Sequence, residues 1–147
     1  HTAFGMPRRT AVGTDYNRVN LLMAVIEKRM GIQMGDYDAY VNVAGGMKVN
    51  EPAMDLALVM ALISSCKNRA IDPATLVFGE VGLSGEVRAV SNVQQRVMEA
   101  KKLGFKRCIL PAVSVKSLKD VEGIELVGVK NIKEAGENIW HIRCVMV

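Results

Sequence analysis

The segment TLVFGEVGLSGEVRAV, residues 75–90, decides the fold expected for this chain. β-Branched and aromatic residues are frequent in Thr75–Val81, so this part predicts a strand. Gly82-Leu-Ser-Gly85 has the composition of a tight turn, and Glu86–Val90 then returns as the partner strand. The segment therefore predicts a β-hairpin, around which the other elements are arranged.

Helices are expected on both sides of this hairpin. Upstream, Pro52 suits the first turn of a helix whose apolar stripe ends near Asn68 or Arg69. Downstream, Asn92 is placed to cap a helix that ends at Gly104. Both helices carry their apolar residues at helical spacing, so each is expected to pack one face against the sheet.

The rest of the chain supplies further strands and helices. Near the N-terminus we expect a helix from Thr14 or Asp15 to Gly31, a strand over Ala39–Val43, a turn at Ala44-Gly-Gly46 and a second strand over Met47–Val49. Near the C-terminus we expect a strand over Arg107–Leu110, a helical turn over Ser114–Asp120, a strand over Ile124–Val129 and a helix from Asn131. Because hairpins alternate with crossover helices, the order predicts an α+β fold with a mixed sheet and packed helices.

Length and composition limit the class of protein. The chain has 147 residues, of which 50% are hydrophobic and 23% charged, which indicates one folded domain and excludes wholesale disorder. We expect a loose leader over residues 1–13, the domain over 14–138 and an unassigned tail over 139–147. The formal net charge of +4 permits an anionic partner without requiring one.

Several locations and kinds of site are disfavoured by the sequence. No apolar run is long enough to cross a membrane, and the three cysteines form no CxxC pair, so we expect a cytoplasmic protein whose cysteines are small buried hydrophobes. The two histidines, His1 and His141, stand near the chain ends, and we expect no metal site. Neither a GxxxxGK[ST] nor a GxGxxG motif is present, so we expect no ATP binding by this chain.

Two stretches resemble the proteolytic domain of Lon proteases: Val49-Asn-Glu-Pro-Ala-Met-Asp55 and Gly79-Glu-Val-Gly-Leu-Ser-Gly-Glu-Val87. Active Lon domains carry a Gly-Pro-Ser-Ala-Gly segment at the first place and a Gly-Gly-Leu-Lys segment at the second. This resemblance puts Ala53 at the position of the nucleophilic serine and Gln94 at that of the lysine base. Neither side chain can act as nucleophile or base, so the resemblance implies a Lon-like domain without proteolytic activity.

A wider set of phrases resembles the Lon-like C-terminal domain of the RadA (Sms) family of bacterial DNA repair proteins. The resemblance covers residues 4–135 and is carried by Pro7–Arg18, Tyr40–Lys48, Glu51–Ala57, Phe78–Arg88 and Gln94–Arg107. It implies a hexameric, ATP-driven motor that acts on single-stranded or branched DNA in recombination and branch migration. A zinc motif and a RecA-like ATPase would precede this domain, so zinc, ATP and magnesium are expected only in that N-terminal part.

Four cations are the candidate DNA contacts: Arg9, Arg18, Lys48 and Arg88. They stand at turns or at the ends of elements, and arginine forks suit phosphate oxygens well. No helix-turn-helix or aromatic platform is present, which favours backbone binding without sequence preference. Arg18 opposes the dipole of the helix that it begins, so it also suggests a partner anion, such as Asp15 or a carboxylate of a neighbouring subunit.

Two alternatives stay open beside DNA binding. The first is a protein-interaction or ring-scaffold module, in which the basic residues only make subunit contacts. The second is a residual hydrolase that uses another serine, such as Ser84 or Ser91. Ser84 stands in the expected hairpin turn and Ser91 at a position typical of a helix cap, so both have ordinary structural roles.

Overall fold

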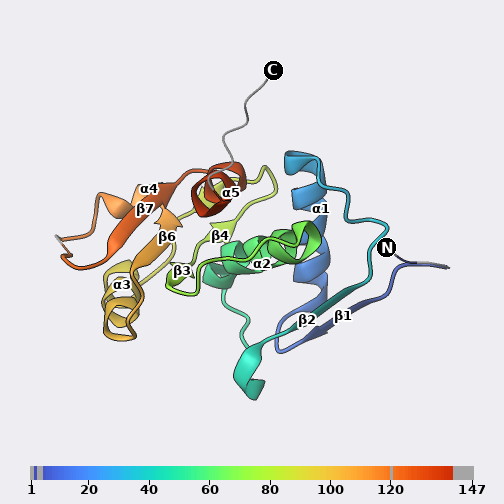
Figure 1. Cartoon of the computed structure of the whole chain (residues 1–147), viewed down its shortest axis with the longest axis horizontal. Coiled ribbons are helices and arrows are strands. Elements are labelled where there is room, and N and C mark those ends of the chain that lie inside the picture. Colours follow the sequence, from blue (N-terminus) through green and yellow to red (C-terminus); the bar gives the residue numbers. More distant parts are fainter. Residues whose placement is uncertain (1, 3–4, 120, 141–147) are drawn as a thin grey trace.

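The computed structural model describes residue 2, residues 5–119 and residues 121–140. The elements follow one another in this order: β1 (Arg9–Val12), α1 (Tyr16–Met30), β2 (Ala39–Asn42), η1 (Ala44–Gly46), η2 (Pro52–Met54), α2 (Asp55–Lys67), β3 (Thr75–Val77), β4 (Glu80–Val81), β5 (Val87–Arg88), α3 (Val93–Lys102), β6 (Arg107–Pro111), α4 (Ala112–Val115), β7 (Glu125–Val129) and α5 (Ile132–Trp140). In Figure 1, α1 and α2 lie beside β1 and β2, whereas α3, α4, β6 and β7 form the other side of the molecule.

The N-terminal unit is a β–α–β crossover. The Asp15 carboxylate caps α1 by accepting from the Arg18 backbone N–H at 2.7 Å, and Gly31 ends the helix at φ 65°. Strands β1 and β2 pair in parallel, with Arg9 opposite Ala39. A parallel pair needs a crossover connection, which α1 supplies.

Two expectations for this unit are wrong. Met47–Val49 form no strand, because η1 turns the chain away from β2 and the Val49 N–H then donates to the Gly13 carbonyl at 2.7 Å. The partner of β2 is instead β1, so Arg9–Val12 of the expected loose leader are a strand. The alternation of residues 39–43 identified a strand but not its neighbour.

The helix predicted from Pro52 is confirmed. It begins as η2 and continues as α2, whose side chains Leu56, Val59, Met60 and Ile63 are buried. Asn68 ends it in the left-handed conformation, with φ 50°. Burial around most of its circumference follows from the nearly continuous apolar sequence of this helix.

The central sheet contains β3, β6 and β7, all parallel, with β6 in the middle. The expected strand Thr75–Val81 is divided between this sheet and β4, because the chain leaves β3 at Gly79. The Gly79 N–H donates to the Ala53 carbonyl at 2.8 Å, and its own carbonyl accepts from the Leu56 N–H at 3.0 Å. The start of α2 is thus hydrogen-bonded to the link between β3 and β4.

Strands β4 and β5 form the predicted antiparallel hairpin, with Val81 opposite Val87. Its turn is tied to the start of α5, because Ile132 N–H donates to the Gly85 carbonyl at 2.9 Å. The parallel and antiparallel pairs therefore lie in separate sheets, and the expected single mixed sheet is wrong. The architecture is a mixture of helices and strands that remains compatible with an α+β class.

The C-terminal elements shift slightly from expectation. The helical turn is α4, which covers Ala112–Val115 instead of Ser114–Asp120. The last helix, α5, includes Trp140, so the first residues of the expected tail are helical. The remainder of that tail, His141–Val147, lies outside the described residues.

Two clusters of buried side chains form the core. The larger one surrounds α1 and α2 and includes Ile109, whereas the smaller one surrounds α3 and includes Cys108 and Leu110. These three residues are consecutive on β6, where successive side chains point to opposite faces. The central strand therefore belongs to both clusters and joins them.

Candidate functional site

The two positions of the expected degenerate dyad lie on different helices. Ala53 is in η2, where it is buried with 4% of its surface exposed. Gln94 is exposed in the first turn of α3, and its Oε1 accepts from the Lys119 backbone N–H at 3.2 Å. Neither residue contributes a hydroxyl or an amine at these positions.

An ion pair joins the segments that carry these two residues. Arg96, two residues after Gln94, donates to the carboxylate of Glu51, two residues before Ala53. The Arg96 guanidinium also lies over the Phe78 ring, 5.9 Å from its centroid. The start of α3 is thereby held against the segment that leads into α2. This contact is an ion pair that supports packing, and neither of its side chains is a serine-type nucleophile.

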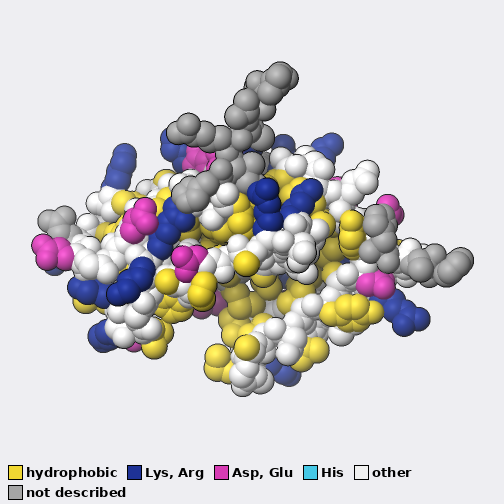
Figure 2. Space-filling view, viewed as in Figure 1, with side chains coloured by type: hydrophobic (Ala, Val, Ile, Leu, Met, Phe, Trp, Pro, Cys, Tyr) yellow, Lys and Arg dark blue, Asp and Glu magenta, His cyan; other side chains and the backbone are white. Residues whose placement is uncertain are grey.

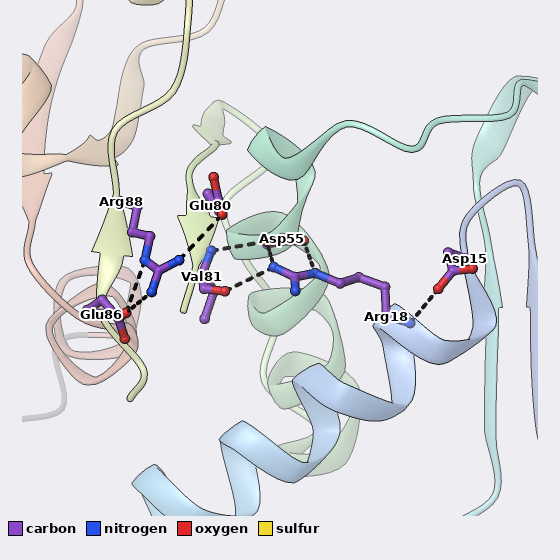
Figure 3. A network of polar contacts seen from close by, with 7 residues as sticks. All are labelled: Asp15, Arg18, Asp55, Glu80, Val81, Glu86 and Arg88. Atoms are coloured by element: carbon purple, nitrogen blue, oxygen red, sulfur yellow. Dashed lines mark hydrogen bonds and ion pairs between the residues drawn. The ribbon is translucent and has the colours of Figure 1, made fainter. Parts of the chain in front are cut away.

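The polar centre of this region is Asp55, the first residue of α2 (Figure 3). Its carboxylate is only 2% exposed, and it accepts from Arg18 Nε at 2.9 Å and from the Val81 N–H at 3.1 Å. Arg18 Nη2 donates both to Asp55 Oδ2 and, at 3.0 Å, to the Val81 carbonyl. Asp55 therefore connects α1, α2 and β4, and its buried charge is compensated.

Arg18 is positioned by the first turn of α1. The hydrogen bond with Asp55 raises the pKa of its guanidinium; burial opposes this effect, and the charges of Asp55 and Glu80 add to it. The anion that the helix dipole requires is thus a carboxylate of the same chain, 37 residues away in sequence. Asp15, the sequence-adjacent candidate, accepts from the Arg18 backbone instead of its side chain.

Arg88 approaches β4 from the opposite side to Arg18 (Figure 3). It donates to Glu86 Oε1 at 2.6 Å through Nη2, and its Nη1 lies 3.8 Å from Glu80. Hydrogen bonds with its own backbone and with Arg88 lower the pKa of Glu86. The structure therefore places Arg18 and Arg88 on either side of one short strand, each beside carboxylates.

Arg9 and Lys48 lie apart from that network. Arg9 donates to the Asn20 amide oxygen at 3.0 Å, a neutral partner on α1. Lys48 is exposed in the segment after η1, and it makes no ion pair or hydrogen bond with another described residue through its side chain. The four candidate cations therefore do not share a single set of contacts.

A hollow of about 320 Å³ lies beside Asp55, between the starts of α1 and α2. Its charged lining residues are Asp15, Arg18, Glu51, Asp55 and Glu80. One cation faces four carboxylates, so the hollow is acidic and does not suit a phosphate. Asp55 is the residue whose role the sequence analysis missed, although the unpaired Arg18 at a helix start was a signal that a buried anion would face it.

Residues 2–114 of the chain match the family model described as ChlI, subunit ChlI of Mg-chelatase. The chain belongs to this ChlI family. The match includes the starts of α1 and α2 and the whole β4–β5 hairpin, which together build the Arg18–Asp55 network.

Individual relatives of this ChlI-family chain carry another name. It is 54% identical over 134 residues to the DNA repair protein RadA of Bacillus subtilis, with 91% of this chain and 29% of that protein aligned. The DNA repair protein RadA of Escherichia coli is 47% identical over 135 residues, which are 92% of this chain and 29% of that protein. The resemblance to the RadA family is confirmed, and the chain spans less than a third of these relatives.

Two further features are absent from the described part of this ChlI-family chain. Among residues 2, 5–119 and 121–140, no group of three or more His, Cys, Asp or Glu side chains is arranged to hold a metal ion. Within the same ranges, no helix is long and apolar enough to cross a membrane. Ser84 and Ser91 are both exposed, and the described contacts of each involve backbone atoms.

Proposed function

We propose that this chain is a non-catalytic, Lon-like domain of a RadA-type DNA repair ATPase, which supports ring assembly and binds the DNA backbone without sequence preference. The observation that carries the proposal is the identity of 46–54% to RadA proteins over about nine tenths of the chain. The resemblance to Lon domains adds that Ala53 and Gln94 would stand at the positions of the dyad. The ATP, magnesium and zinc of such a protein would bind other parts of it. Its place would be the cytoplasm, and its assembly a hexameric ring engaged in branch migration.

Lys48 and Arg9 are the strongest of the four proposed DNA contacts. Lys48 is exposed and has no carboxylate partner among the described residues, and the hydrogen bonds that Arg9 donates to those residues end on the neutral oxygens of Asn20 and Met34. Arg88 is 55% exposed, so it can turn toward a phosphate while it stays near Glu86. Arg18 is held by Asp55, and we assign it mainly to positioning the first turn of α1.

A salt titration of DNA binding tests the proposal. The binding of a labelled single strand and of a branched duplex is measured by fluorescence anisotropy between about 50 and 200 mM salt. For a protein with a few phosphate contacts, this increase in salt lowers the affinity by roughly tenfold or more. We expect Lys48→Gln with Arg88→Gln to weaken binding and to reduce the salt slope by about one to two. Lys28→Gln with Lys116→Gln removes the same charge from exposed positions elsewhere and serves as the control. Affinity that is independent of salt, or unchanged in the first variant, would refute DNA backbone binding at these residues.

A second candidate function is a ring-scaffold module without DNA contact. It is favoured by one observation, the acidic hollow beside Asp55, in which carboxylates outnumber the single cation Arg18. Sedimentation velocity separates the two functions. If Lys48→Gln with Arg88→Gln dissociates the assembly and DNA affinity falls only as a result, the scaffold function is correct.

The residual-hydrolase alternative has a direct chemical test. A serine-reactive phosphonate is incubated with the protein, and the intact mass is measured. We expect no adduct, because the described hydrogen bonds of Ser84 and Ser91 use their backbone atoms, and no described side chain that could act as a base bonds to either hydroxyl. One adduct per chain that disappears in Ser84→Ala or Ser91→Ala would show that a nucleophilic serine exists.

A further inference from the structure

A groove of about 510 Å³ lies where the last turns of α1 and α2 meet α5. Its floor is mostly apolar and is made by Met30, Ile32, Ile63, Gly136 and Trp140. Its charged lining residues are Arg29, Lys67, Arg69, Lys133 and Glu137. In Figure 2, Lys and Arg side chains gather beside hydrophobic ones over the region between α5 and α1. Four cations against one carboxylate make this groove basic, in contrast to the acidic hollow beside Asp55.

The four cations of this groove have no anionic partner among the described residues. None of them takes part in an ion pair or donates a side-chain hydrogen bond to those residues. Arg29 and Lys67 stand in last turns, where the helix dipole favours a cation. Lys133 stands in the first turn of α5, where the dipole disfavours it, and Arg69 follows the end of α2. The charge of Lys133 is therefore not explained by the helix that carries it.

The apolar part of the groove has a fixed aromatic ring. The Trp140 indole N–H donates to the Ala70 carbonyl at 3.1 Å, which holds the ring at the edge of the groove. Gly136 lies between the two large apolar side chains of the lining, because a Cβ there would be in van der Waals contact with Met30 Cε at 3.5 Å and Trp140 Cζ3 at 3.7 Å. A flat apolar group with an attached anion is the ligand that such a lining accommodates.

We propose that this groove binds one nucleotide unit, with its phosphate near Arg69 and Lys133 and its base against Trp140 and the apolar floor. A volume of about 510 Å³ is sufficient for one nucleotide and too small for a stretch of duplex. A duplex also keeps its bases stacked inside, so the source is either a single strand of nucleic acid or a free nucleotide. The site is separate from Arg9, Arg18, Lys48 and Arg88 and does not depend on the DNA contacts proposed for them.

The position of Trp140 provides the readout. It is the only tryptophan of the chain, so intrinsic fluorescence reports on this groove. The protein is titrated with a twenty-nucleotide oligothymidylate, with thymidine monophosphate and with inorganic phosphate. We expect saturable quenching by at least one of the two thymine-containing ligands, at lower concentration than any effect of phosphate. If the single strand is the source, it binds more tightly than the mononucleotide; the reverse order indicates a free nucleotide.

The matched variants decide whether the cations bind the ligand. We expect Arg69→Gln with Lys133→Gln to lower the affinity for the ligand that quenches Trp140 by about tenfold, which is the effect of losing two phosphate contacts. Lys101→Gln with Lys106→Gln removes two exposed charges that do not line the groove and is expected to change the affinity less than about threefold. Thermal unfolding of both variants checks that the fold is kept.

Two results would overturn the nucleotide groove. The first is that neither thymine-containing ligand quenches Trp140, even if the protein binds DNA in the anisotropy assay. The second is that both double variants lose affinity equally, which would indicate a general charge effect. Conversely, quenching that is lost only in Arg69→Gln with Lys133→Gln supports the groove even when Lys48→Gln with Arg88→Gln binds DNA normally. The two proposals can therefore fail independently.

Discussion

Asp55 illustrates at the residue scale how a buried carboxylate is held by donors from other elements. It begins α2 and has almost no exposed surface, and its carboxylate accepts hydrogen bonds from Arg18 and from the Val81 N–H. A buried carboxylate without these donors would carry a large desolvation cost. The contact therefore ties α1, α2 and β4 together.

Replacing Asp55 should destabilise the protein strongly. We expect Asp55→Ala to lower the free energy of unfolding by about 3 kcal/mol, because Arg18 and the Val81 N–H both lose their acceptor. This value is at the lower end for buried pairs, since the Arg18 side chain is 33% exposed and partly solvated. Urea unfolding followed by circular dichroism measures it.

The matched control is the ion pair of Glu125 Oε2 and Arg107 Nε, which are 3.2 Å apart; Glu125 is the exposed partner, whereas the Arg107 side chain is 18% exposed. Glu125→Gln should cost less than about 1 kcal/mol, because Glu125 is 64% exposed. Equal losses in the two variants would contradict the central role of Asp55.

Cys108 gives a second prediction at this scale, on pH dependence. Burial raises the pKa of its thiol from 9.0 to about 12, so the folded protein keeps the thiol protonated where the unfolded chain loses the proton. The unfolded state then binds fewer protons, and stability falls by up to about 1.4 kcal/mol per pH unit as the pH rises from 9 toward 12.

The measurement is urea unfolding at pH 8 and at pH 10. We expect Cys108→Ala to be less stable than the parent at pH 8, through loss of packing, but to lose less stability between the two pH values. The same decrease in both proteins would show that Cys108 is not the titrating group.

At the element scale, a close contact between two backbone segments determined the conformation of residues 47–49, which their local sequence pattern did not. Residues 47–49 have the alternation of a strand, but they lie against Gly13 and have no sheet partner. A Cβ at Gly13 would lie 2.6 Å from the Met47 carbonyl oxygen and 2.8 Å from Val43 Cβ. The absence of a side chain at Gly13 therefore permits the chain after η1 to return beside the start of α1.

Gly13→Ala should separate this close approach from the cost of backbone conformation. Gly13 and Gly45 have almost the same φ, 81° and 83°, but nothing lies within 4 Å of a Cβ at Gly45. We expect Gly45→Ala to cost about 1 kcal/mol and Gly13→Ala about 3 kcal/mol, measured as the free energy of unfolding. Similar values for both variants would mean that the Met47–Val49 segment does not depend on contact with Gly13.

At the scale of the whole molecule, β6 joins the two hydrophobic clusters. Ile109 faces the larger cluster, and Cys108 and Leu110 face the smaller one, all three with no exposed surface. Removal of either cluster therefore exposes one face of the central sheet. We expect the described domain to unfold as one cooperative unit.

Two probes test this cooperativity. Trp140 packs against the larger cluster, so its fluorescence follows that side, whereas far-ultraviolet circular dichroism follows all helices and strands. We expect both transitions to coincide in urea, for the parent and for Leu110→Ala, which should lose about 2–5 kcal/mol. A variant in which the circular dichroism changes before the tryptophan signal would show that the clusters unfold separately.

Local sequence patterns were sufficient for most elements. The periodicity of apolar residues predicted α1, α2 and α3, and the glycine turn predicted the β4–β5 hairpin, because these features depend on residues close in sequence. The same patterns could not predict that β2 pairs with β1, since an alternating strand does not specify its neighbour. The candidate cations were also identified by type and position, but their partners were not. The partner of Arg18 is 37 residues away in sequence, and the partner of Arg88, Glu86, is fixed by the geometry of the β4–β5 hairpin.

The amino-acid sequence by itself determined the kinds of elements, their order, the resemblance to the RadA family and the lack of a nucleophile at Ala53 or a base at Gln94, because each is a property of adjacent residues or of residue identity. Only the tertiary structure decided which charges are neutralised. It paired Arg18 with the buried Asp55, and it left Arg69 and Lys133 without an anion beside Trp140. The physical reason is that a charge interacts through space with whatever packing brings near it, and packing depends on the whole chain.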